Sequence, residues 1–298
     1  MTVSDTTALE AVLRRDRLVV IAALVAVVAI AWIWILSGAG TGMSAVAMAG
    51  DAGMADMLMQ PAAWSPGYAV LIFAMWWVMM TAMMLPSATP MLLLFARVNR
   101  VERAHDRPYA PTGIFAGGYL LVWGAFSALA TLLQWGLQQF GLLSPMMTPT
   151  SYWLGGAILI AAGLWQITPL KGVCLSHCRS PISFLMTGWR PGRLGAFRMG
   201  LEHGAFCLGC CWFLMGLLFF GGVMNPVWIA GLSVFVLLEK TVPLGHWIGR
   251  IAGVGAAVWG VAMLLAALPS GPIAAPDAEN SAATPMPMPA PAAPPVRQ

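Results

Sequence analysis

The sequence predicts an all-α fold, a polytopic bundle of transmembrane helices. Of its 298 residues, 59% are hydrophobic and only 9% are charged, whereas a soluble domain is about 25% charged. Several segments also stay apolar over about 20 residues, the length that a helix needs to cross a bilayer. These observations exclude a soluble globular protein and make the lipid bilayer the first expected partner of the chain.

Seven segments have the length and hydropathy of a membrane-spanning helix. The sixth, "PVWIAGLSVFVLLEK", is short, so an arrangement of six helices is the alternative. The second contains Pro86 and Pro90, which lack a backbone donor and predict a kink. The seven segments are residues 18–36, 67–96, 113–138, 152–170, 199–221, 226–240 and 246–268.

The basic residues predict the orientation of these helices. Of the 15 Lys and Arg residues, all except Arg297 lie on connections that alternate to the same side. By the positive-inside rule this side is cytoplasmic, so the amino terminus is expected inside and the carboxyl terminus outside. The net charge of +4 follows from this topology, and we expect no nucleic-acid partner.

The chain divides into three parts along its length. Residues 1–17 are a cytoplasmic segment, residues 18–268 are the transmembrane domain, and residues 269–298 are a Pro/Ala-rich tail that we expect to be disordered. Within the transmembrane domain, the outward connection 37–66 is rich in methionine, and the inward loop 171–198 contains cysteines.

The fifth predicted helix contains "LEHGAFCLGCCWFLMG", a polar and thiol-rich stretch in an apolar setting. His203, Cys207, Cys210 and Cys211 share one stripe about 100° wide on a helix. The predicted cytoplasmic side is reducing, which disfavours structural disulfides and favours metal or redox chemistry. The alternative is that these cysteines only pack as small hydrophobic residues.

The predicted inward loop adds a second pair of thiols in the motif "KGVCLSHCRSP". Prolines on both sides of this motif predict a constrained turn at the mouth of the bundle. Thiolates and imidazoles are ligands for Cu(I) and Zn(II). We therefore expect a metal site made of Cys174, Cys178, His203, Cys207, Cys210 and Cys211, with His177 as a reserve ligand.

The second predicted helix carries a cluster of methionines at Met79, Met80, Met83 and Met84. Thioether sulfur binds Cu(I) where thiols would be oxidised, so methionine outside and cysteine inside favour Cu(I) over Zn(II), which stays the alternative. The methionines in this helix are equally explained as flexible fillers of a membrane core. Ionisable residues in "LLEKTVPLGHW", at the inner end of the sixth helix, have either a functional or an end-of-helix role.

Four motifs together resemble a bacterial family described as predicted metal-binding integral membrane proteins, a family of unknown function. They are "WWVMMTAMMLPSATP", "PLKGVCLSHCRSP", "GLEHGAFCLGCCWFLMGLLFFGGVMNPVW" and "LLEKTVPLG", and the likeness covers about residues 66–265. The resemblance implies a multi-pass protein of the bacterial inner membrane. It also implies a metal site at Cys174, Cys178, His203, Cys207, Cys210 and Cys211, but it implies no reaction.

Three functional hypotheses follow from these observations. The first is a Cu(I)-handling protein that transports or transfers the ion between an outward Met-rich site and an inward Cys/His site, with a metal chaperone or a metalloprotein client as partner. The second is a membrane thiol–disulfide oxidoreductase, and the third is a non-catalytic assembly subunit. The sequence contains no phosphate-binding loop, so ATP-driven pumping is not expected, and no catalytic residue is predicted.

Overall fold

The computed structural model describes residues 3–39, 63–104, 108–144 and 147–268. In these ranges the chain forms helices α1 (Val3–Leu36), α4 (Pro66–Ala104), α5 (Thr112–Gln139), α6 (Tyr152–Ile167), α7 (Pro169–Arg179), α8 (Pro181–Gly188), α9 (Gly192–Gly221), α10 (Pro226–Thr241) and α11 (Gly245–Ala267). The all-α prediction is confirmed. The methionines of the outward connection and the carboxyl-terminal tail lie outside the described residues.

All seven predicted apolar segments are helical, but not all are long enough to cross a membrane. Within the described residues, five helices have the required length and hydropathy, and a bent pair, α6 with α7, raises the number to six at most. The predicted seven spans and the predicted orientation are therefore not confirmed. The difference arises at α6 and α10, which have 16 residues each. Only α6 reaches the required length, when it is counted together with α7.

The segment 171–198, expected to be a loop, contains helices α7 and α8 and the beginning of α9. The Thr168 hydroxyl caps α7 by accepting a hydrogen bond from the Lys171 amide, and Pro169 occupies the first turn. The chain bends by 64° between α6 and α7 at this point. Prolines that look like loop residues in the sequence therefore start new helices, and the bend turns α7 toward α9.

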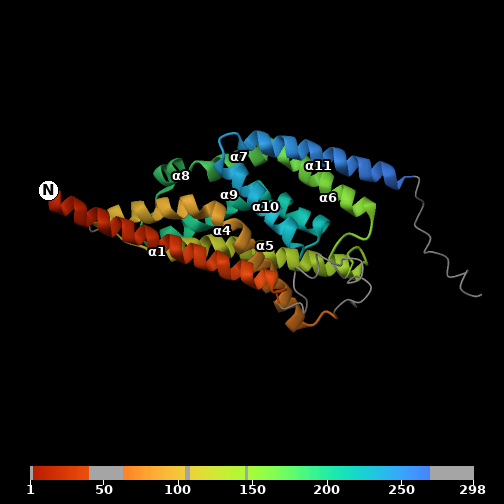
Figure 1. The fold of residues 1–298 in the computed structure, drawn as a ribbon, viewed down its shortest axis with the longest axis horizontal. Helices are drawn as coiled ribbons and strands as arrows, with labels where there is room; N and C mark the ends of the chain where they lie inside the picture. Colours follow the sequence, from red (N-terminus) through yellow and green to blue (C-terminus); the bar gives the residue numbers. More distant parts are fainter. Residues whose placement is uncertain (1–2, 40–62, 105–107, 145–146, 269–298) are drawn as a thin grey trace, which may run out of the picture.

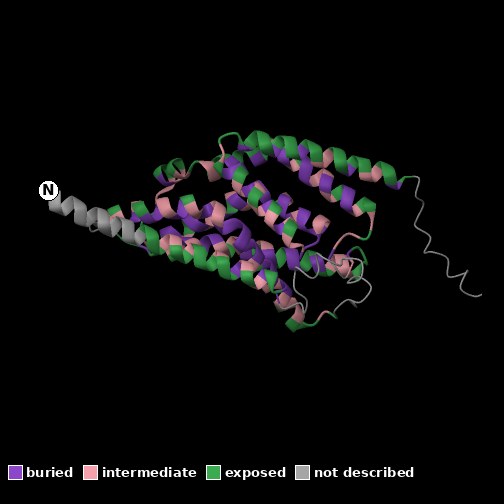
Figure 2. Ribbon diagram, in the orientation of Figure 1, coloured by how far each residue is buried: buried purple, intermediate pink, exposed green. Residues whose placement is uncertain are grey.

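The burial pattern places the core in the middle of the bundle. Figure 1 shows α1 along one edge of the molecule and α11 along the opposite edge, next to α6. Figure 2 shows that α1 and α11 are mostly exposed, whereas buried residues gather on α4, α5, α9 and α10 between them. Apolar side chains on the outer helices therefore form a surface that suits lipid.

Glycines allow two helix pairs to pack closely. A Cβ atom built at Gly163 on α6 would lie 2.5 Å from the carbonyl oxygen of Gly253 on α11. One built at Gly260 would lie 2.7 Å from the carbonyl oxygen of Gly156. Gly118 on α5 and Gly200 on α9 meet backbone atoms of the opposite helix in the same way. Small residues at such crossings are typical of helix packing in membranes.

The glycine contact between α6 and α11 generates a prediction. The substitution Gly253→Val places side-chain atoms where Gln166 and the Gly163 carbonyl already lie, and overpacking of this kind costs about 1–3 kcal/mol. We expect a lower midpoint in thermal unfolding of the detergent-purified protein. Gly255→Val is the matched control on α11, because a Cβ atom at Gly255 meets nothing within 4 Å. Equal midpoints for the two variants would contradict the packing account.

Candidate metal site

Thiols from two helices meet in the interior of the bundle. On α9, Cys207, Cys210 and Cys211 are each about 1% exposed. On α7, the side chain of Cys178 contacts both Cys207 and Cys210. A Cβ atom built at Gly209 would lie 2.8 Å from the Cys174 Sγ atom, so the missing side chain at this position lets α7 approach α9. We refer to these five cysteines as the thiol cluster.

Two thiols of the cluster form hydrogen bonds with the backbone of α9. The Cys210 and Cys211 thiols both donate to the Cys207 carbonyl oxygen, at 3.1 and 2.9 Å. Cys211 Sγ also lies 3.9 Å from Met84 Sδ on α4. The cysteines of α9 are thereby connected to a thioether of another helix.

Lys240 on α10 lies beside the thiol cluster. Its ammonium group donates to Cys207 Sγ at 2.9 Å and to the Ser87 hydroxyl at 3.3 Å. The Tyr119 hydroxyl lies 3.1 Å from Cys207 Sγ and donates to the Met84 carbonyl oxygen at the same distance. Hydrogen bonds around Cys207 therefore join helices α4, α5, α9 and α10.

The other charged residues near Lys240 have partners outside the thiol cluster. Lys171 on α7 forms an ion pair with Glu239, and both side chains are buried. The Arg179 guanidinium donates to the carbonyl oxygens of Val242 and Pro243 at 2.7 and 2.8 Å. These contacts fix α7 to the end of α10, and they leave the cation of Lys240 facing the cysteines.

The two predicted histidine ligands lie in different surroundings. His203 is 3% exposed, and its ring lies among Phe115, Tyr119 and Phe184, with centroid distances of 6.1, 5.8 and 5.7 Å. Its Nδ1 atom has no hydrogen-bond partner among the described residues. An imidazole nitrogen without a partner inside an apolar bundle is a free polar group next to the thiols.

His177, in contrast, is exposed and contacts α9 outside the thiol cluster. Its Nδ1 atom lies 2.9 Å from the Val173 carbonyl oxygen, and its ring stacks on Phe206 with centroids 4.2 Å apart. The structure therefore does not bring the reserve ligand into the thiol cluster.

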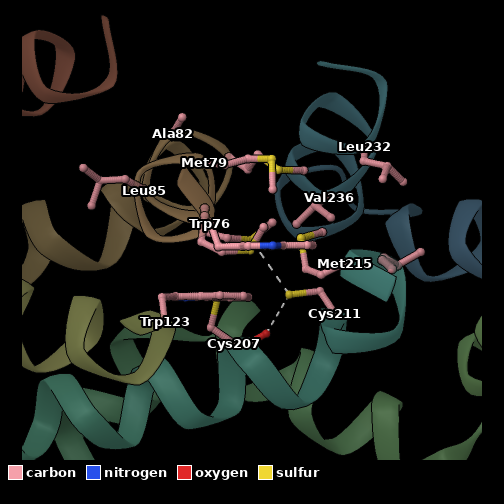
Figure 3. Close-up of a cluster of buried hydrophobic side chains, with 14 of the residues drawn as sticks. Trp76, Met79, Ala82, Leu85, Trp123, Cys207, Cys211, Met215, Leu232 and Val236 are labelled. Carbon is pink, nitrogen blue, oxygen red and sulfur yellow. Dashed lines mark hydrogen bonds between the residues drawn. The ribbon is translucent and has the colours of Figure 1, made fainter. Parts of the chain in front are cut away.

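The predicted methionines of α4 are all in the core. Met79, Met80, Met83 and Met84 are each 1% exposed or less. Figure 3 shows Met79, Cys207, Cys211 and Met215 in one cluster of buried side chains with Trp76 and Trp123. Met84 contacts the sulfur of Cys211 with its own sulfur atom.

Sequence reasoning missed part of this site. The motif "LLEK" had identified Lys240 as an ionisable residue at a helix end, but not its contact with Cys207. Ser87 and Met215 lie within quoted motifs and Tyr119 lies in an apolar segment, but none of the three was predicted as a site residue. Their positions depend on how helices pack, which the periodicity of a single helix does not encode.

The donor set fits Cu(I) in its chemistry, although the side chains are not arranged around a metal ion. In the described part of the chain, no group of three or more His, Cys, Asp or Glu residues is placed to hold a metal. The thiols of Cys210 and Cys211 point to a carbonyl instead. Thiolate, thioether and imidazole are nevertheless the ligands that Cu(I) prefers, and rotation of these two thiols would free them for binding.

Comparisons with known proteins identify a family. A model of the PpoB2 family, described as copper chaperones, matches residues 73–263. No curated protein and no solved structure matches the chain. The match supports a copper-related role for the chain. It lies within the region of the motif resemblance, about residues 66–265, and includes the whole thiol cluster and the methionines of α4. Since it covers more than half of the sequence, the chain belongs to the PpoB2 copper chaperone family.

Proposed function

We propose that this protein is a membrane-embedded copper chaperone that takes Cu(I) as cargo at the thiol cluster and passes it to a copper-protein client. The supporting observation is the sulfur contact in the bundle interior between Met84 on α4 and Cys211 on α9. Cys178 on α7 extends it through its contacts with Cys207 and Cys210. Soft sulfur ligands select Cu(I) over harder ions, and the nearby buried carboxylate of Glu239 is already paired with Lys171.

The electrostatics of the cluster suit a monovalent cation. Cys207 accepts a hydrogen bond from the Lys240 ammonium, whereas Cys210 and Cys211 act as thiol donors. One thiolate beside one ammonium is neutral. Adding Cu(I) and removing a proton from a second thiol keeps the site neutral, and charge neutrality is what a low-dielectric interior demands. Zn(II) would need a further thiolate to reach the same balance.

The ends of the cluster indicate how cargo enters and leaves. Cys174 and Cys178 are only partly buried, whereas the three cysteines of α9 are buried. The α7 end is therefore the accessible side, and the methionines of α4 extend inward from it. In this proposal the protein lies in the bacterial inner membrane with α7 at the cytoplasmic face, and Cu(I) is exchanged between the Met and Cys ends by ligand substitution.

The contact of Cys178 with Cys207 and Cys210 favours a second candidate function, thiol–disulfide exchange. In that case a thiol of α7 and a thiol of α9 would form a reversible disulfide. The two functions differ in what the reduced protein binds, because disulfide exchange requires no metal.

The central test is Cu(I) binding by the reduced, detergent-purified chain in competition with a chromophoric Cu(I) chelator. We expect about one Cu(I) per chain for a thiolate site, lost in the double variant Cys207→Ser/Cys210→Ser. His177→Ala is the control, because its imidazole lies outside the thiol cluster. If the double variant keeps its copper, the proposal is wrong. A metal-free native chain that forms an α7–α9 disulfide on mild oxidation would establish the second function instead.

A further prediction concerns Lys240 as a positioning residue. In Lys240→Met the buried thiolates lose their compensating cation, so we expect the Cu(I) affinity to fall by roughly 10–100-fold, the usual effect of removing a group that supports metal ligands. Lys240→Arg keeps the charge and should recover part of the affinity. An unchanged affinity in Lys240→Met, measured with the same chelator, would show that the ammonium does not support the site.

A further inference from the structure

A cavity remote from the thiol cluster combines arginines with an apolar wall. It lies between α1 and α4 and has a volume of about 460 Å³. Arg17 of α1 and Arg97 and Arg100 of α4 supply its cationic part. Leu93 and Leu94 belong to the apolar part. None of the residues that line it belongs to the thiol cluster.

The helix geometry separates the two parts of this cavity. Arg97 and Arg100 are three residues apart and therefore lie on one face of α4, and Leu93 lies one turn before Arg97 on the same face. Arg17 reaches the cavity from α1, which packs against α4. The charged part is thus at one end of the cavity, and the leucines continue along the helix from it.

Two of these arginines, Arg17 and Arg97, are available to bind an anion. Arg17 and Arg97 are exposed, and neither forms an ion pair with another described residue. Guanidinium groups match the oxygens of a phosphate with paired hydrogen bonds. A ligand that satisfies both parts of the cavity needs an anionic phosphate and an apolar chain.

We infer that this cavity binds one anionic phospholipid, with its phosphate held by Arg17 and Arg97 and an acyl chain along Leu93 and Leu94. The outer surface of α1 supports a lipid over a soluble phosphate. Leu18 and Val19, directly after Arg17, are 58% and 60% exposed, so the cavity borders an apolar surface that faces the bilayer. Basic pockets between helices near a membrane surface recognise acidic lipid headgroups in this way.

The test is native mass spectrometry of the delipidated full-length protein in detergent, titrated with palmitoyl-oleoyl phosphatidylglycerol or with the matching phosphatidylcholine. We expect one phosphatidylglycerol to bind per chain, in preference to phosphatidylcholine. Arg17→Gln/Arg97→Gln should weaken this binding by roughly tenfold or more, since each basic residue near a membrane surface contributes appreciably. The control is Arg193→Gln/Arg198→Gln, which removes two exposed arginines of α9 outside the cavity and should bind like the native chain.

A second variant tests the apolar part without changing charge. Leu93→Trp fills the cavity beside intact arginines and should also reduce phosphatidylglycerol binding. Three results would each overturn the inference: equal binding of the two lipids, an equal loss in both arginine variants, or displacement of the lipid by glycerol phosphate at equal concentration. The last result would indicate a soluble phosphate ligand. Cu(I) binding by Arg17→Gln/Arg97→Gln should remain native, so the inference and the proposed function fail separately.

Discussion

The hydrogen bond from Lys240 to Cys207, 2.9 Å long, is the interaction on which the interior of this bundle depends. An ammonium group buried among apolar helices requires an acceptor, because an unpaired charge there is very costly. Lys240 finds its acceptors on α9 and α4, and Tyr119 of α5 completes the network at the same cysteine. The polar contacts that stabilise the core are therefore the same contacts that place the thiols.

Close packing at glycines brings these groups within reach. Gly118 and Gly200 let the backbones of α5 and α9 touch, which brings the Tyr119 hydroxyl within 3.1 Å of Cys207 Sγ. Gly209 makes room for the sulfur of Cys174, and the 64° bend between α6 and α7 turns the second pair of thiols toward the first. These features gather sulfur atoms in an apolar interior, as the proposed Cu(I) site requires.

The helical segments of the fold could be predicted from the sequence, since the length of an apolar segment and its helical periodicity are local properties. The burial of the α9 stripe, including His203 and Cys211, follows from its spacing in the same way. The helices α7 and α8 were not predicted, because Pro169 and Pro181 can either end a segment or begin a helix. The partners of Cys207 and the exposed position of His177 depend on helix packing, which a single sequence does not specify.

The central claim is that sulfur atoms of α4, α7 and α9 hold Cu(I) inside the bundle. The most direct measurement is X-ray absorption spectroscopy of the reduced protein loaded with one equivalent of Cu(I). We expect the nearest neighbours of copper to be mainly sulfur atoms. This signal should change when Met84 is replaced by leucine and should be lost in a variant without cysteines. A first shell of nitrogen and oxygen ligands, unchanged by removal of the cysteines, would contradict it.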